Sequence, residues 1–260
     1  DRSTSGTLGD RLPFIALGQS LQARGHRVRL AINRAMHAHA RRAGLVAVSL
    51  TDVERGEEKA RQNPWAWNHW HYPDQTAHPS SPVADPREYL GQVQRLTAVC
   101  RDADLLIATA IRPMGYIVAN ILDMPWLTAS MNPYAFWQPT STSQQQALIQ
   151  LRRKEYRNLG PLINSIFQAV NSEVKVPAWS PGWLYARHVL LACSRYLISF
   201  DQNQLQPGTS IDPTGFWFYQ DPDWKDWQPD SELEAFCRPG SDGKRPLALT
   251  FSSQPLEDPA

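Results

Sequence analysis

Patterns typical of helices and of strands alternate along most of the chain, and this alternation restricts the possible fold more than any other feature. Apolar residues recur every three to four positions in the helical stretches and at every second position, or in short apolar runs, in the strand-like ones. The expected helices are 13–24, 35–43, 87–101, 113–122, 143–173 in two pieces broken near Gly160–Pro161, and 231–236. The expected strands are 28–32, 45–50, 105–108, 126–131, 189–193, 213–218 and 246–251. Such alternation predicts an α/β, Rossmann-like domain, with a mostly parallel sheet covered by helices on both faces.

A change in composition divides the chain. From Gln220 to Arg245 the residues are rich in Asp, Pro, Gly and Trp, which is typical of a linker between domains. We therefore expect a first domain over 1–219, a linker over 220–245, and the first strand of a second domain within 246–260.

Composition excludes several classes of protein. The 26 basic and 25 acidic residues are interspersed, which argues against a nucleic-acid partner. Three widely separated cysteines form no disulfide framework and no C-x-x-C metal site, as expected for the reducing cytoplasm. No stretch approaches the ~20 apolar residues of a membrane span. We expect a soluble cytoplasmic protein, with peripheral membrane contact left open.

A glycine-rich turn precedes the first expected helix. Glycines at Gly6 and Gly9 would let the backbone approach a ligand, and the helix N-terminus would offer amide donors to an anion. Asp10 would then lie at the ligand edge of the sheet, although an aspartate beside a helix start is often only a cap. A strand should come before Gly6, but residues 1–5 are too few and too polar to form it. Either that strand lies upstream, or residues are missing between positions 1 and 6.

Two long segments, 51–86 and 132–142, follow expected strand ends, where open α/β sheets bind ligands. Their aromatic side chains either form the walls of an apolar pocket or pack the loops onto the sheet. The aromatic residues considered are Trp65, Trp67, Trp70, Tyr134, Phe136 and Trp137. A metal site made of His69, His71 and His78 is disfavoured, because their spacing matches no common metal template.

Several separated motifs, which follow one another in order, resemble those of one enzyme family. Residues 6–18 read GTLGDRLPFIALG, and residues 21–28 read LQARGHRV. Further matches are 103–107 (ADLLI), 122–126 (LDMPW), 213–218 (PTGFWF) and 246–253 (PLALTFSS). The chain resembles the N-terminal half of GT-B glycosyltransferases of the sterol-glucosyltransferase and antibiotic-glycosyltransferase group. It departs from them at Leu8, where an arginine is usual, and at Ser252, where a glycine is usual.

The resemblance implies two Rossmann-like domains that face each other across a cleft, the first binding the acceptor and the second the nucleotide-sugar. It implies Asp10 as the general base of an inverting hexosyltransferase. Contacts to the donor would come from Thr7, Gly9 and Ser253. Contacts to a small apolar alcohol would come from Leu12, Trp65, Trp67, Trp70, Asn132, Tyr134, Phe136 and Trp137. It implies no metal and no cofactor besides a UDP- or dTDP-linked sugar as co-substrate.

Two other functions compete with this one. A degenerate GT-B half could bind a hydrophobic ligand without transferring sugar. A dinucleotide-dependent oxidoreductase is disfavoured, because no G-x-G-x-x-G fingerprint follows a strand. The histidine- and glycine-rich donor motif of the family is not found in residues 1–260, so we expect this chain alone to be inactive.

Overall fold

The computed structural model describes residues 8–32, 34–50, 86–109, 113–131, 141–176, 185–198, 208–239 and 243. The chain divides into two compact units, Asp1–Tyr219 and Gln220–Ala260. The assignment of an acceptor domain, a linker and a donor domain stays a prediction.

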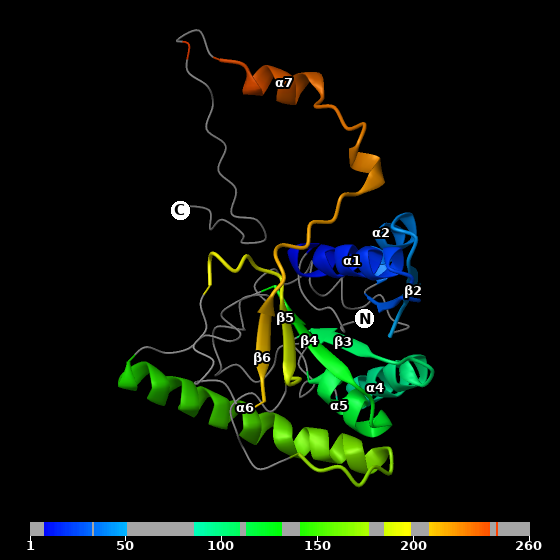
Figure 1. The fold of residues 1–260 in the computed structure, drawn as a ribbon, viewed down its shortest axis with the longest axis vertical. Coiled ribbons are helices and arrows are strands. Elements are labelled where there is room, and N and C mark those ends of the chain that lie inside the picture. The colour runs from blue at the N-terminus through cyan, green and yellow to red at the C-terminus, as the bar shows by residue number, and fades with distance from the viewer. Residues whose placement is uncertain are drawn as a thin grey trace. The chain divides into compact units, whose positions relative to one another are not determined.

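The described strands of the first unit form two parallel sheets (Figure 1). One sheet has two strands and the other has four, in the order β3-β4-β5-β6. The strands are β1 (Arg29–Ala31), β2 (Val46–Val48), β3 (Leu106–Thr109), β4 (Trp126–Ser130), β5 (His188–Leu191) and β6 (Ser210–Pro213). Every described strand pair is parallel, which confirms the predicted α/β class.

The helices of this unit lie on the faces of the sheets, and several of them connect parallel strands. They are α1 (Leu8–Ala23), the short 3-10 helix η1 (Arg34–Met36), α2 (His37–Arg42), α4 (Pro86–Cys100), α5 (Met114–Leu122) and α6 (Thr142–Ala169). Helix α2 leads from β1 to β2, and α5 leads from β3 to β4, as crossovers between parallel strands require. Helix α2 ends before Gly44, whose φ of 75° suits glycine.

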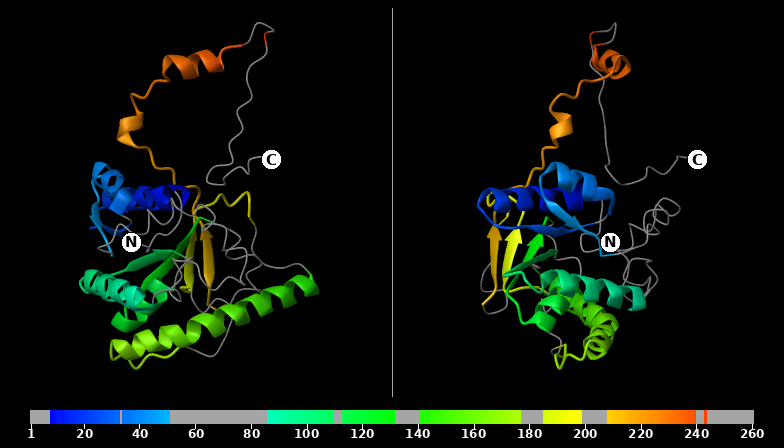
Figure 2. Two further views of the ribbon diagram at one scale, coloured as in Figure 1. Left: turned by 180° about the vertical axis from the view of Figure 1, so that it is seen from behind. Right: turned by 90° about the vertical axis from the view of Figure 1, so that its right-hand side faces the viewer.

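Two apolar layers cover opposite faces of the four-stranded sheet, because successive strand side chains point to opposite sides. Leu106 and Trp126 pack against the core formed with α4, α5 and α6. Ile107 and Ala129 belong to the other core, formed with α1 and α2. Figure 2 shows these two helical layers on either side of the strands. Helices on both faces of the sheet were predicted and are confirmed.

Helix α5 lies unusually close to the sheet at Gly115. A Cβ atom built on Gly115 would lie 2.2 Å from the Cβ of Ala108 in β3 and 3.3 Å from the ring of Trp126 in β4. Only glycine permits this approach without a shift of the helix or the strand.

Two helix predictions were wrong in detail. Helix α1 begins at Leu8 rather than at residue 13, so Pro13 lies inside it. Helix α6 is continuous through Pro161 and shows no break. Pro161 supplies no amide to the carbonyl one turn earlier, and its own side chain is exposed. Ile163 and Phe167 are fully buried and hold the following turns on the core.

The last strand was predicted over 213–218, but β6 ends at Pro213. Proline supplies no amide hydrogen, and Gly215 adopts a φ of 82°. The regular strand ends here, although Thr214 and Gly215 still donate from their amides to the Leu191 and Cys193 carbonyls. Residues 214–219, which we call the anchor segment, do not continue the strand.

The second unit contains the 3-10 helix η5 (Pro222–Trp224) and α7 (Ser231–Cys237). Asp230 caps α7 by accepting a hydrogen bond from the Leu233 amide at 2.8 Å. The short helix predicted over 231–236 is confirmed. The strand predicted over 246–251 lies outside the described residues.

Candidate active site

The candidate active site is the edge of the sheet where the four parallel strands end. Strands β3, β4, β5 and β6 stop at Thr109, Ser130, Leu191 and Pro213. Main-chain hydrogen bonds continue to this edge, where the amide of Ala192, just after β5, donates to the carbonyl of Ser130 at the end of β4, at 2.8 Å. Open α/β sheets bind their ligands at this edge.

The first turn of α1 brings the predicted catalytic residue into this region. Helix α1 passes beside the carboxyl ends of β5 and β6 (Figures 1 and 2). Gly9 and Asp10 are the second and third residues of α1, and Gly9 is exposed. The first amides of a helix have no partners within it, and the helix dipole favours a negative charge there. A helix start of this kind is therefore a favourable place for a negative charge.

Leu12 lies in the second turn of α1, where its half-buried side chain packs against the core of α1 and α2. The side chain of Leu12 thus contributes to the packing of this core. The predicted roles of Gly9, Asp10 and Leu12 toward donor and acceptor stay predictions.

The anchor segment ties α1 to the sheet. Thr214 donates from its amide and from its hydroxyl to the Leu191 carbonyl, at 2.9 and 3.1 Å. The indole Nε1 of Trp217 donates to Thr214 Oγ1 at 3.0 Å. The same ring meets Phe14 of α1 edge-on, with ring centroids 6.3 Å apart. This chain of contacts fixes the position of α1 relative to the end of β5.

The anchor segment alternates between buried and exposed aromatic residues. Tyr219 is 7% exposed and donates to the His39 carbonyl at 3.3 Å, whereas Phe216 and Phe218 are 50% and 78% exposed. The centroids of the Phe216 and Phe218 rings lie 5.7 Å apart. The two rings form an apolar surface on the anchor segment that sequence reasoning did not assign. The alternation is visible in the sequence, where a period of two predicts a strand over 213–218.

Most of the predicted ligand contacts lie outside the described part of the chain. They are Thr7, Trp65, Trp67, Trp70, Asn132, Tyr134, Phe136, Trp137 and Ser253. Their roles stay predictions, as does the interpretation of His69, His71 and His78. Within the described ranges, no group of three or more His, Cys, Asp and Glu residues is placed to hold a metal ion.

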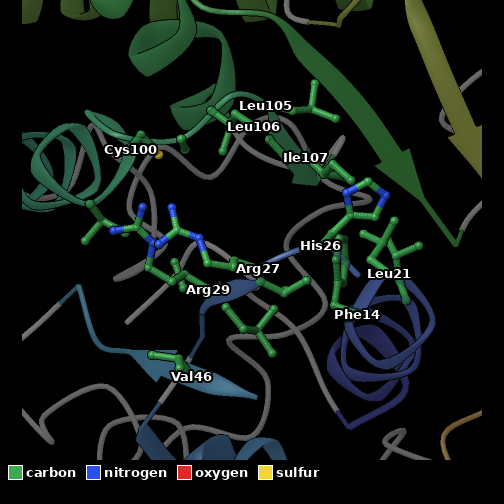
Figure 3. Close-up of a pocket in the computed structure, with 18 of the residues that line it drawn as sticks. Phe14, Leu21, His26, Arg27, Arg29, Val46, Cys100, Leu105, Leu106 and Ile107 are labelled. Carbon is green, nitrogen blue, oxygen red and sulfur yellow. The ribbon is translucent and has the colours of Figure 1, made fainter. Parts of the chain in front are cut away.

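A pocket of about 860 Å³ lies between β1 and β3 (Figure 3). Two groups that line it have shifted pKa values. Burial raises the pKa of the Cys100 thiol, an effect partly opposed by the charge of Arg29. The hydrogen bond from Arg29 to the exposed Asp102, at 2.6 Å, lowers the pKa of that carboxyl. A buried thiol of raised pKa is a poor nucleophile, so we assign Cys100 no catalytic role.

Comparison with known proteins identifies the relatives of the chain. No protein-family model matches it. The chain is 25% identical, over 283 aligned positions, to O-mycaminosyltylonolide 6-deoxyallosyltransferase of Streptomyces fradiae, covering 96% of this chain and 60% of that protein. It is 24% identical over 289 positions to a sterol 3-beta-glucosyltransferase of Arabidopsis thaliana, covering 98% of this chain and 42% of that protein. The chain therefore spans about half the length of these two relatives.

Solved structures show the same architecture. The calicheamicin glycosyltransferase CalG4 matches with a TM-score of 0.54 at 13% identity, over 86% of this chain and 52% of that one. The glycosyltransferase of kitacinnamycin matches with a TM-score of 0.52 at 16% identity, over 85% of this chain and 52% of that one. The chain has the Rossmann-like fold of one half of a GT-B glycosyltransferase, as the resemblance implied.

Proposed function

We propose that this chain, which matches one half of a GT-B glycosyltransferase, is the acceptor-binding half of an inverting hexosyltransferase. The whole enzyme transfers a sugar from a nucleotide-sugar to a hydroxyl of a small apolar alcohol. The observation that carries the proposal is the position of Asp10, in the first turn of a helix that lies beside the carboxyl edge of a GT-B sheet.

Asp10 acts as the general base in this proposal. A hydroxyl attacks an anomeric carbon poorly until its proton is removed, so a carboxylate within hydrogen-bond reach accelerates the step. The acceptor oxygen forms the new bond to the anomeric carbon, its proton passes to Asp10, and the bond to the nucleoside diphosphate breaks on the opposite face. One such displacement inverts the anomeric configuration.

An apolar acceptor suits the surface near this edge. Phe216 and Phe218 expose their rings on the anchor segment, which is hydrogen-bonded to the end of β5. Exposed aromatic rings offer a large contact area at little cost in conformational entropy. One curated relative is named for a sterol and another for O-mycaminosyltylonolide, which supports a bulky alcohol as acceptor.

The donor is a UDP- or dTDP-linked sugar, held mainly by a second domain that begins within 246–260, with Ser253 as one contact. Thr7 and Gly9 contribute from the first domain, and neither a metal nor a further cofactor takes part. None of the described helices is both long and apolar enough to cross a bilayer. We place the enzyme in the cytoplasm, with peripheral contact to membranes where a lipid acceptor resides.

A chimaera tests this function. The chain is joined to the donor half of the Streptomyces fradiae relative and supplied with UDP-glucose or dTDP-glucose and a panel of sterol and macrolide alcohols. We expect the chimaera to form an inverted glycoside and the 260-residue chain alone to form none. A folded chimaera that binds the alcohols but transfers no sugar would favour the non-catalytic binding module. Transfer by the chain alone would refute the division of labour between the two halves.

A further inference from the structure

The first turn of α1 is held by few hydrogen bonds of its own helix. Helix α1 begins at Leu8 and contains Pro13. In an α-helix the amide of each residue donates to the carbonyl four positions earlier, and proline has no amide hydrogen. Pro13 therefore leaves the Gly9 carbonyl without a helical donor, and the first amides of the helix have no helical acceptors either. The turn that carries Asp10 thus depends on contacts outside itself for a fixed position.

Phe14 is the residue through which outside contacts reach this turn. It follows Asp10 by four positions, which is one helical turn, with a rise of about 6 Å. Residues at this spacing lie on the same face of a helix, and the amide of the later one pairs with the carbonyl of the earlier one. Phe14 is 6% exposed and belongs to the core of α1 and α2. A contact that fixes Phe14 therefore also fixes the turn that begins at Asp10.

Trp217 of the anchor segment makes such a contact. Its ring meets the ring of Phe14 at an angle of 74°, the edge-to-face arrangement that aromatic pairs favour. A ring contact alone would leave the indole free to turn, but its Nε1 donates a hydrogen bond to Thr214 Oγ1. The half-buried indole is thus held by a ring contact on one side and by a hydrogen bond on the other.

Thr214 connects this indole to the end of β5. A hydroxyl group has one hydrogen to donate and two lone pairs to accept with. The hydrogen of the Thr214 hydroxyl goes to the Leu191 carbonyl, and a lone pair accepts from Trp217. Leu191 is the last residue of β5 and is fully buried, so it is a fixed point. Each contact from the sheet edge to α1 therefore has a defined partner on both sides.

Tyr219 belongs to the same segment but connects it to a different helix. Its hydroxyl donates to the His39 carbonyl, and its ring meets the ring of His39 with centroids 6.2 Å apart. His39 lies in α2. The anchor segment therefore makes two separable connections, one through Trp217 to α1 and one through Tyr219 to α2.

We propose that Trp217 is a positioning residue for sugar transfer, supported by Thr214, and that it holds α1 where Asp10 can take the proton of the acceptor hydroxyl. This inference rests on the proposed role of Asp10 as general base. A general base must come within about 2.6–3.2 Å of the group that it deprotonates. A displacement of about 1 Å can cost roughly a hundredfold in rate, so the position of α1 sets the rate of the chemical step.

The test measures kcat and the KM for the acceptor in the chimaera, which contains the whole 260-residue chain. Trp217→Ala should lower kcat about tenfold or more and change KM less than about twofold, because the contact matters only in the transition state. Trp217→Phe keeps an aromatic ring beside Phe14 and should recover part of kcat. Thr214→Val removes only the bridging hydroxyl and should behave like Trp217→Phe. These two milder variants keep the test valid if Trp217→Ala does not fold.

Two controls separate positioning from stability. Tyr219→Phe removes one hydrogen bond from the same segment but not the connection to α1, so kcat should stay within about twofold of the wild type. In an Asp10→Asn background Trp217→Ala should change the remaining kcat less than about twofold, since no base is left to position. Equal effects of Trp217→Ala with and without Asp10 would overturn the proposal. So would a rise in KM at unchanged kcat, which would indicate that Trp217 contacts the acceptor.

A measurement without turnover separates this inference from the proposed function. In the 260-residue chain, amide hydrogen exchange at Phe14 reports the opening of the turn that begins at Asp10. Trp217→Ala should speed exchange at Phe14 at least about tenfold more than at the buried Ile117 of α5, and Tyr219→Phe should not. Unchanged exchange at Phe14 would overturn the positioning role even in an active chimaera. A wild-type chimaera that transfers no sugar would refute the proposed function and, with it, the catalytic part of this inference.

Discussion

The close approach of α5 to the sheet at Gly115 gives a stability prediction whose sign can be worked out. In Gly115→Ala the new Cβ would lie 2.2 Å from the Cβ of Ala108, whereas carbon atoms pack best at about 3.5–4.0 Å. Helix α5 and β3 must therefore separate by more than 1 Å in a well-packed core. Overpacking of this kind costs about 1–3 kcal/mol, and the gain in helix propensity offsets at most about 1 kcal/mol. We expect a net loss of about 1–2 kcal/mol.

Gly91→Ala is the matched control. Gly91 also lies inside a helix, but a Cβ atom there would meet nothing within 4 Å. Removing glycine from this helix should stabilise the protein by about 0.5–1 kcal/mol. Thermal melts should show a fall of about 2–8 °C for Gly115→Ala and a rise of about 1–4 °C for Gly91→Ala. If both variants shift in the same direction, the packing argument for Gly115 is wrong.

Three further predictions concern the site and the contacts around it. In the chimaera, Asp10→Asn should lower kcat about a hundredfold or more while the melt changes little, and near-normal turnover would remove Asp10 from the mechanism. Trp217→Phe keeps an aromatic ring near Phe14 but loses the hydrogen bond to Thr214, so the free energy of unfolding should fall by about 0.5–1 kcal/mol. Trp217→Ala also loses the ring contact and should lower it further. Equal losses in the two variants would contradict a stabilising contact between Trp217 and Phe14. The hydrogen bond from Arg29 lowers the pKa of Asp102 below its ordinary value of 3.8. The pair therefore stabilises the fold fully above pH 3.8, and this stabilisation is lost as the pH falls through the lowered pKa of Asp102. Melts in acid should therefore fall less steeply for Asp102→Asn than for the wild type, and equal slopes would refute this.

Sequence patterns predicted the layers of the fold because helix and strand periods are local properties. Helical spacing and the apolar run at 105–108 were enough to place α4 and β3. The patterns failed where tertiary contacts decide the outcome. Pro161 indicates a break by local rules, yet burial of Ile163 and Phe167 keeps α6 continuous.

The anchor segment shows a different limit of sequence reasoning. An alternation of period two indicates an extended chain with one buried face, but it does not say what covers that face. Here the inward side chains, Trp217 and Tyr219, pack on α1 and α2 instead of extending the sheet. In the same way, no local pattern could reveal the pocket, whose walls come from Arg29 and Ile107, far apart in sequence. Asp10 could be singled out only through its motif, since an acidic residue at a helix start is common.

The bond between Tyr219 and His39 has a consequence for how the protein is made. The two residues are 180 positions apart, and the anchor segment completes the core in which α1 and α2 pack. At a synthesis rate of about 5–20 residues per second, roughly 10–40 s pass between the translation of His39 and that of Tyr219. During that interval the first two helices lack the aromatic cover that they have in the finished fold. The nascent chain thus exposes its N-terminal apolar surface for tens of seconds, a period in which chaperones can bind it.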